Sequence, residues 1–135
     1  MSQKALRLLG LALRGSNLAV GELPVGEACQ THRARLVLHA ADAAENTVRR
    51  ASREAQRAGV ELVALPCTKE ELGAALGRNS CAVAALTDKG LAAAVAADLA
   101  QTNGDLEPLA QALAESSRGK QTKTVGRRRT PRNAN

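Results

Sequence analysis

The sequence predicts an α/β fold, because three short apolar runs alternate with two helical patterns between residues 35 and 88. Each run has the length and the composition of a buried or half-buried strand. The order strand, helix, strand, helix, strand implies right-handed crossovers, so it favours a largely parallel core sheet. The three predicted strands are residues 36–40, 60–65 and 81–86.

Both helices of this unit carry capping signals at their ends. The first follows Asp42, the predicted N-cap, with Glu45 three residues later, and Gly59 ends it. Thr68 opens the second helix with the same pattern, and Gly77 closes it. These residues therefore predict where each helix begins and where it stops.

Arginines recur every four residues along the first of these helices. They form a basic ridge, a pattern that most often marks a solvated helix face. Glu54 is placed to pair with Arg50 or Arg57 on the same helix. The ridge residues are Arg49, Arg53 and Arg57.

Three further elements are predicted ahead of the first strand of this unit. Residues 2–14 place apolar side chains on one helical face and basic side chains on another. Residues 18–20 fit a brief strand. Residues 21–31 fit a helix with Pro24 in its first turn, although Gly26 weakens that helix.

The C-terminal part is predicted as a helix, a second short helix and a basic tail. Residues 89–101 are rich in Ala and should pack on the sheet as a helix. Leucines at 106, 109 and 113 indicate a short amphipathic helix within residues 104–116, which docks weakly or meets a partner. Residues 117–135 have almost no apolar side chains, so they are expected to be disordered when free. We expect the folded domain to be residues 1–103.

Composition limits the kinds of function that are open to the chain. Its 135 residues include no Phe, Trp or Tyr, so Leu, Val and Ala must build the core. The same absence removes aromatic platforms on which single-stranded bases could stack. We find no apolar run of membrane-spanning length and no signal-peptide pattern, so we expect a cytoplasmic protein without a membrane partner.

Cysteines and histidines give no recognisable metal or cofactor pattern. The three cysteines form no Cys-x-x-Cys pair, and the two histidines do not complete a zinc-binding spacing. We therefore expect no metal and no cofactor, and we interpret the cysteines as small buried side chains in a reducing compartment. These residues are Cys29, Cys67, Cys81, His32 and His39.

The net charge of +6 lies mainly at the C-terminus. From Arg118 onward there are seven Lys or Arg residues and no acid, whereas residues 1–117 hold 12 cations against 13 acids. The body of the protein is therefore close to neutral. A polyanionic partner would be attracted first by the tail.

Several short motifs keep their order and spacing over residues 2–98. They are residues 8–12 (Leu-Leu-Gly-Leu-Ala), 14–15 (Arg-Gly), 21–22 (Gly-Glu), 34–38 (Ala-Arg-Leu-Val-Leu), 41–43 (Ala-Asp-Ala), 45–47 (Glu-Asn-Thr), 68–73 (Thr-Lys-Glu-Glu-Leu-Gly) with Gly77, 82–84 (Ala-Val-Ala) and 87–90 (Thr-Asp-Lys-Gly). With these motifs the chain resembles the ribosomal L-seven-Ae superfamily, and within it the small bacterial YlxQ-type proteins.

This resemblance implies a three-layer α/β/α sandwich with a small mixed four-stranded sheet, the ribosomal L-thirty-e-like fold. It implies RNA binding without catalysis, typically to a kink-turn, by a protein associated with the ribosome or with translation. The RNA would be ribosomal RNA or another kink-turn-like structured RNA, and we expect a monomer. The bent RNA backbone and its sheared G·A pairs would meet the loop and helix start around Gly21.

The candidate RNA-binding residues follow from that resemblance and from the basic side chains. Family members that recognise kink-turns carry an Asn-Glu pair ahead of a helical Lys, and the aligned positions here hold Leu23, Pro24 and Glu27. We therefore predict a structured-RNA binder of altered or relaxed specificity, with several of its cations around one end of the sheet. The candidates are Arg14, Asn17, Gly21, Glu22, Arg33, Arg35, Lys69, Arg78 and Asn79, together with Arg127, Arg128 and Arg129 of the tail.

Two other classes of function remain open. A protein-interaction adaptor could use this fold with residues 106–113 or the arginine ridge as its contact surface, and the tail would then give only nonspecific RNA affinity. An enzyme could use His39 with Asp42, or Cys67 beside Lys69. His39 lies inside an apolar run, where a buried and hydrogen-bonded histidine is more common. Because no nucleophile, base and orienting group can be assembled, we predict no catalysis.

Overall fold

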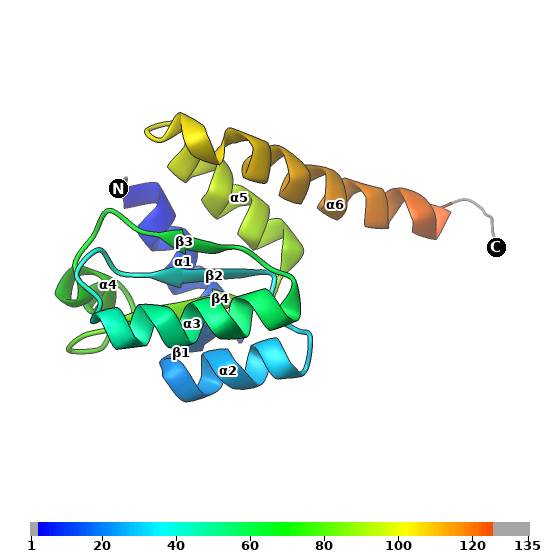
Figure 1. The fold of residues 1–135 in the computed structure, drawn as a ribbon. Coiled ribbons are helices and arrows are strands. Elements are labelled where there is room, and N and C mark those ends of the chain that lie inside the picture. The colour runs from blue at the N-terminus through cyan, green and yellow to red at the C-terminus, as the bar shows by residue number, and fades with distance from the viewer. Residues whose placement is uncertain (1–2, 126–135) are drawn as a thin grey trace.

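The computed structural model describes residues 3–125, with the side chains of residues 3–118. Helices and strands alternate along most of the chain (Figure 1). The elements in order are α1 (Gln3–Arg14), β1 (Leu18–Val20), α2 (Glu22–Gln30), β2 (Leu36–His39), α3 (Glu45–Ala58), β3 (Leu62–Ala64), α4 (Lys69–Ala75), β4 (Val83–Leu86), α5 (Lys89–Ala100), the 3-10 turn η1 (Gly104–Leu106) and α6 (Glu107–Val125).

The four strands form one mixed sheet in the order β1-β4-β2-β3. Strands β2 and β3 are parallel, whereas β4 runs antiparallel to both of its neighbours, β2 and β1. The prediction of a largely parallel core sheet is therefore wrong, and the mixed sheet implied by the family resemblance is correct.

The direction of β4 follows from the position of α4. This helix has seven residues, about 10 Å by helix geometry, and it lies at one end of the sheet (Figure 1). The Cys81 N–H donates to the Lys69 carbonyl at 2.9 Å, so the chain returns to the end where α4 began. Strand β4 therefore starts beside the last residue of β2, with Val83 opposite His39, and must run antiparallel to it.

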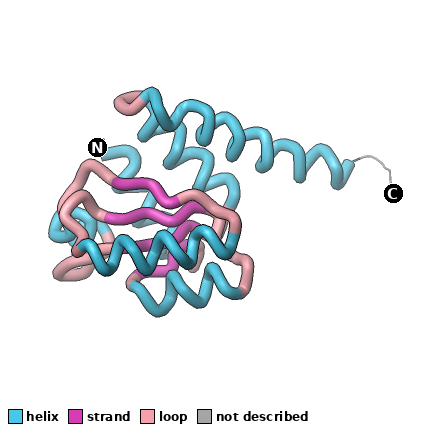
Figure 2. Tube along the Cα trace, viewed as in Figure 1, coloured by secondary structure: helices cyan, strands magenta, loops and turns pink. Residues whose placement is uncertain are grey.

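Helices cover both faces of the sheet, which gives the predicted three-layer α/β/α sandwich (Figure 2). Alternating residues of β2 point into two separate cores, because successive side chains of a strand face opposite ways. Leu36 and Leu38 pack with α1, α4 and α5, whereas Val37 packs with α2 and α3. All three side chains are fully buried.

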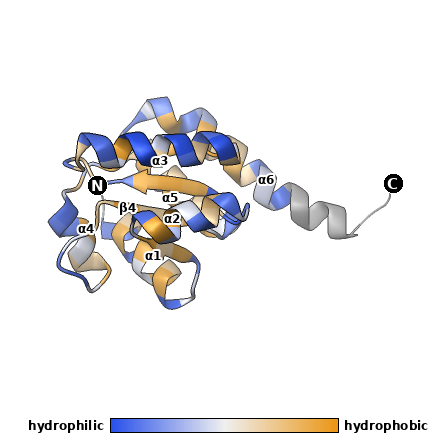
Figure 3. Cartoon of the chain, turned by 60° about the horizontal axis from the view of Figure 1, so that its bottom comes forward, coloured by the Kyte–Doolittle hydropathy of each residue, from blue (hydrophilic) through white to orange (hydrophobic). Residues whose placement is uncertain are grey.

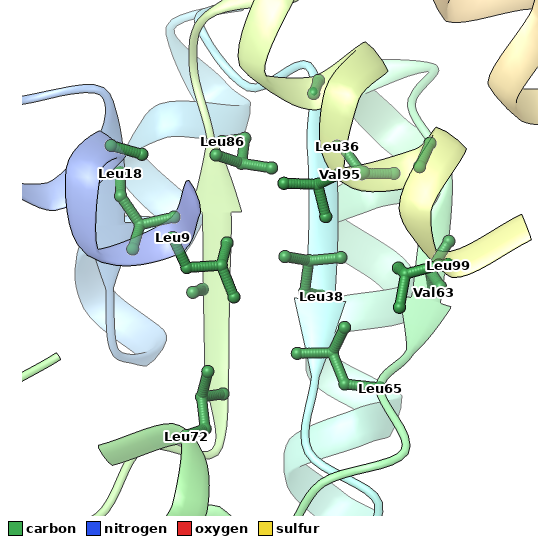
Figure 4. Close-up of a cluster of buried hydrophobic side chains, with 14 of the residues drawn as sticks. Leu9, Leu18, Leu36, Leu38, Val63, Leu65, Leu72, Leu86, Val95 and Leu99 are labelled. Atoms are coloured by element: carbon green, nitrogen blue, oxygen red, sulfur yellow. The ribbon is translucent and has the colours of Figure 1, made fainter. Parts of the chain in front are cut away.

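Leucines and valines fill the larger core in the absence of aromatic residues. Figure 4 shows Leu9 of α1 and Val95 of α5 reaching toward the leucines of β2 and β4. Small alanines between them, such as Ala84 and Ala92, are also fully buried. Because alanine takes little room, the helices can approach the sheet closely.

Three of the four capping predictions are confirmed, and Gly77 follows the end of α4 in the left-handed conformation, with φ of 73°. Thr68 Oγ1 accepts from the Glu71 N–H at 3.1 Å, and Glu71 Oε1 accepts from the Thr68 N–H at 2.8 Å, so α4 has a complete capping box. Gly59 ends α3 in the left-handed conformation, with φ of 74°. Asp42 is not the N-cap of α3, because Ala44 takes that position.

The helices at the C-terminus pack as a pair. Helix α5 matches its prediction, and the leucines at 106, 109 and 113 pack against the larger core beside it. Helix α6 is longer than the helix expected within residues 104–116, and its backbone continues to Val125 through the first part of the predicted tail. Once packing has provided the nucleus, each further residue adds a hydrogen bond, so the helix can extend beyond its apolar part. The predicted tail residues Arg127, Arg128 and Arg129 lie outside the described residues.

Within residues 3–125 we find no helix that combines the length and the apolar character needed to span a membrane. Figure 3 shows the distribution of polar residues: blue segments recur along α3, whereas β4 is apolar throughout. The four residues of β4 are all buried. The charged residues of the described part therefore lie on helices and in the loops at the two ends of the sheet.

Candidate nucleic-acid interface

The loops gather at two ends of the sheet, which we name by one residue each. At the Gly21 edge lie the last residues of β1, β2 and β3, the first residue of β4 and the starts of α2, α3 and α4. At the Arg35 edge lie the first residues of β1, β2 and β3 and the last residue of β4. A single RNA contact surface would have to draw its residues mainly from one of these edges.

The candidate residues divide between the two edges, so the expectation that the basic ones share one end of the sheet is wrong. Gly21 donates its N–H to Val83 at 3.0 Å, which places it at the first edge. Arg35 donates its N–H to Leu86 at 2.7 Å, and Asn17 accepts from Thr87 at 2.9 Å, so both lie at the second. The Gly21 edge has Gly21, Glu22, Lys69, Arg78 and Asn79, whereas the Arg35 edge has Asn17, Arg33 and Arg35.

The candidate residues are divided in this way because α2 runs from one end of the sheet to the other. Nine residues carry the chain from Gly21 to Thr31, and the helix is about 13 Å long by helix geometry, close to the length of a strand. The basic residues that follow α2 therefore emerge at the opposite end from the loop that precedes it. From the sequence, these basic residues could be placed next to a strand. The end of the sheet at which that strand begins could not be assigned.

Arg14 belongs to the Arg35 edge by its backbone but reaches toward α4 with its side chain. Its Nη1 lies 3.7 Å from the position that a Cβ atom on Gly10 would take, and the Ala75 carbonyl lies 3.4 Å from the same position. Arg7, Leu11 and Arg14 border a shallow groove between α1 and α4. Cations of α1 therefore lie beside the helix that leads into Arg78.

The start of α2 leaves backbone donors open. Gly21 is its N-cap, and among the side chains of residues 3–118 none accepts a hydrogen bond from the first turn of the helix. Val25 donates to the Gly21 carbonyl, and Pro24 has no N–H, so the N–H groups of Glu22 and Leu23 are those not bonded within the helix. Gly21 has φ of 99°, a conformation that a side chain would strain. This end of α2 offers a positive dipole and two donors to an anion.

At the start of α4, in contrast to α2, backbone N–H groups are already hydrogen-bonded to side chains. Asp42 Oδ1 accepts from the Lys69 N–H at 2.7 Å, which explains why Asp42 does not cap α3. The Thr68 and Glu71 capping box satisfies two further N–H groups. Lys69 can therefore contribute its side-chain charge to an anion site, but its backbone donor is already occupied.

Glu22 is held by α3 and is not presented as a free base-reading group. Arg50 Nε lies 2.7 Å from Glu22 Oε1, and Arg50 Nη2 lies 3.2 Å from Oε2, so the pair is bidentate. Thr47 Oγ1 also donates to Oε2 at 3.2 Å. The hydrogen bond from Arg50 lowers the pKa of the Glu22 carboxyl, although partial desolvation opposes the shift. Arg50 and Thr47 are partners that the sequence did not reveal, because they lie 28 and 25 residues from Glu22.

Of the two surfaces considered for an adaptor, the leucines of residues 106–113 are covered, whereas the arginine ridge is exposed. The leucines of residues 106–113 pack against the core beside α5, so they do not form an open contact face. Arg49, Arg53 and Arg57 are exposed on α3 as predicted, and Arg49 lies 3.7 Å from Glu45 in an exposed ion pair. The ridge thus remains available on the outer surface of the α2 and α3 layer.

Of the groups considered for catalysis, Cys67 is buried, His39 and Lys69 are partly buried and Asp42 is exposed. Cys29, Cys67 and Cys81 are free and buried, and burial raises the pKa of each thiol. His39 is partly buried, with Nδ1 2.8 Å from the Ala40 carbonyl, in line with the hydrogen-bonded histidine that we expected. Among residues 3–118 no three His, Cys, Asp or Glu side chains are grouped so that they could hold a metal ion.

Comparison with known proteins finds similar folds but does not identify a function. No family model and no curated protein matches the chain. Among solved structures 217 chains match, so the fold is not new. One of them is a protein with unknown function from Bacillus halodurans, which is 29% identical with a TM-score of 0.66. The match covers 71% of this chain and 96% of that one. The neighbour therefore corresponds to most of the α/β domain.

Proposed function

We propose that this chain is a non-catalytic protein that binds structured RNA at the Gly21 edge, as a member of the L-seven-Ae superfamily that it resembles. The observation that carries the proposal is the open start of α2, which presents two backbone donors beside a Gly with positive φ. Lys69 and Arg78 border the same edge. A cytoplasmic, monomeric protein associated with ribosomal RNA would fit this role.

In this proposal phosphates provide most of the affinity. The N–H groups of Glu22 and Leu23 bind one backbone phosphate, while cations around α4 and α1 bind others. Arg78 is exposed in the loop between α4 and β4, and the guanidinium of Arg14 lies on the α4 side of α1. The basic tail residues Arg127, Arg128 and Arg129 would add a salt-dependent contribution without selecting a sequence or a shape.

Base recognition differs from that of family members that read kink-turns. Leu23 is 87% exposed at a position where the family has a polar reading group, and Pro24 follows it. Glu22 could accept from a base edge only by leaving Arg50. Each lost bidentate base contact would reduce discrimination by roughly 1–3 kcal/mol, by analogy with reading of DNA bases. The proposal therefore specifies RNA shape and phosphate geometry as the main determinants.

Neutralising a cation at the Gly21 edge should weaken RNA binding more than the same change at the Arg35 edge. Arg78→Gln in the full chain is expected to lower affinity for a kink-turn hairpin by about three- to tenfold at low salt, with a salt slope smaller by about one. Arg33→Gln is the matched control, because it removes the same charge from an exposed residue at the other end of the sheet. Filter binding across a salt series measures both. Equal losses for the two variants would contradict the assignment of the Gly21 edge.

A further inference from the structure

A groove of about 630 Å³ runs between α2 and α3. It begins at Glu22 and Leu23 near the start of α2 and extends along the helix to Gln30. Gly26 and Glu27 form its α2 side, and Arg50 and Glu54 form its α3 side. The groove is lined by charged and apolar residues together, which is typical of a surface that receives an amphipathic side chain.

One carboxylate in this groove lacks a partner. Glu54 Oε1 is inaccessible to solvent and has no hydrogen-bond partner among the described residues. An unpaired buried carboxylate oxygen is costly, so it calls for an explanation such as strain, a functional role, a water molecule or an ion. The predicted pairing of Glu54 with Arg50 or Arg57 does not form among residues 3–118, and Arg50 is bound to Glu22 instead.

Gly26 of α2 lies beside this carboxylate. Glu54 Oε2 lies 3.5 Å from the position that a Cβ atom on Gly26 would take, so the carboxyl group packs over the backbone of α2. Its charge also contributes to the raised pKa of the Cys29 thiol, after the larger effect of burial. The glycine that weakens α2 in the sequence therefore lies where the Glu54 carboxylate packs against the helix.

Charge complementarity specifies what the groove can accept. Arg50 is matched by Glu22, and within residues 3–118 neither Glu27 nor Glu54 takes part in a salt bridge. The two remaining carboxylates repel a polyanion, so the part of the groove around Glu27 and Glu54, beyond the start of α2, is not an RNA site. Leu23, 87% exposed at the rim, offers an apolar contact next to them. A cationic side chain with an apolar neighbour fits both features.

We propose that the groove between α2 and α3 binds an arginine or lysine side chain presented by a peptide segment of a partner protein. The cation donates to the Glu54 carboxylate, and the residue next to it in the partner packs on Leu23. An arginine fits better than a lysine, because a guanidinium is more weakly hydrated than an ammonium and so suits an ion pair at an interface. This proposal is argued independently of the RNA binding proposed above, and the two surfaces meet at Leu23.

The test uses two peptides that differ only in charge. Acetyl-Leu-Arg-Leu-amide and the same peptide with citrulline in place of arginine are titrated into the 15N-labelled full chain up to about 5 mM, enough to populate a complex with a Kd of ~1 mM. The arginine peptide should shift the backbone amides of Gly26, Cys29 and Glu54. The citrulline peptide should bind at least about tenfold more weakly, because it lacks the charge-assisted hydrogen bonds.

Variants test whether the Glu54 carboxylate binds the arginine peptide. Glu54→Gln should bind the arginine peptide as weakly as the wild type binds the citrulline peptide, whereas Glu61→Gln, at an exposed site outside the groove, should bind it normally. Gly26→Ala adds a methyl group in ordinary contact with Glu54 in a helix that tolerates it, and it should also weaken binding. Absence of shifts in the groove, equal binding of the two peptides, or normal binding by Glu54→Gln would each overturn the proposal.

Discussion

Gly73→Ala is expected to destabilise the protein by about 3 kcal/mol, because α4 and the loop before β4 touch backbone to backbone at this glycine. A Cβ atom on Gly73 would lie 2.5 Å from Ser80 Cα and 2.7 Å from Ser80 N. Backbone atoms cannot rotate away as the end of a side chain can. The loop that carries Arg78 would have to move, so RNA affinity should fall together with stability.

Urea denaturation followed by circular dichroism measures this effect. Gly104→Ala is the control, because no atom lies within 4 Å of the position that its Cβ would take and its φ is not positive. That variant should change the free energy of unfolding by no more than about 0.5 kcal/mol. A Gly73→Ala protein as stable as the control would show that the close contact with Ser80 does not hold the loop.

Leu38→Ala should cost about 3–5 kcal/mol, the range for a fully buried leucine whose neighbours cannot collapse into the space. Leu38 is 0% exposed in the central strand β2 and packs with α1, α4 and α5. Helices and strands surround it, so the cavity should persist. A loss of this size is a large part of the stability of a typical domain.

Leu11→Ala makes the same chemical change at an exposed position, where the loss of stability should be small. Leu11 is 52% exposed on α1, so its truncation should cost less than about 1 kcal/mol. The midpoints of urea denaturation of the two variants give the comparison directly. Similar losses for Leu38→Ala and Leu11→Ala would contradict the placement of β2 at the centre of the sandwich.

Features that depend on neighbouring residues could be predicted from the sequence. The Thr68 capping box, the end of α3 at Gly59 and the helix within residues 2–14 each rest on contacts within one or two turns. Apolar spacing likewise predicted the four strands, because each strand was a short run bounded by turn residues. Nearby residues determine such features, so they can be predicted without knowledge of the fold.

Features that depend on distant residues could not be predicted in this way. The direction of β4 follows from where α4 lies, and apolar composition does not encode the direction of a strand. Arg35 and Lys69 were expected at one end of the sheet, and only the pairing of the strands separates them. Glu22 was a candidate RNA contact, but its bond to Arg50 crosses between two helices.

The central claim is that the folded domain, and not only its tail, recognises structured RNA. The most direct measurement compares a kink-turn hairpin with an unkinked duplex over a salt series, using the full chain and a variant with Arg127→Gln, Arg128→Gln and Arg129→Gln. Our account predicts that the variant binds more weakly, with a salt slope smaller by up to about three, yet still prefers the hairpin. If the variant binds neither RNA at low salt, or binds both equally, the domain does not recognise the kinked RNA and the account is wrong.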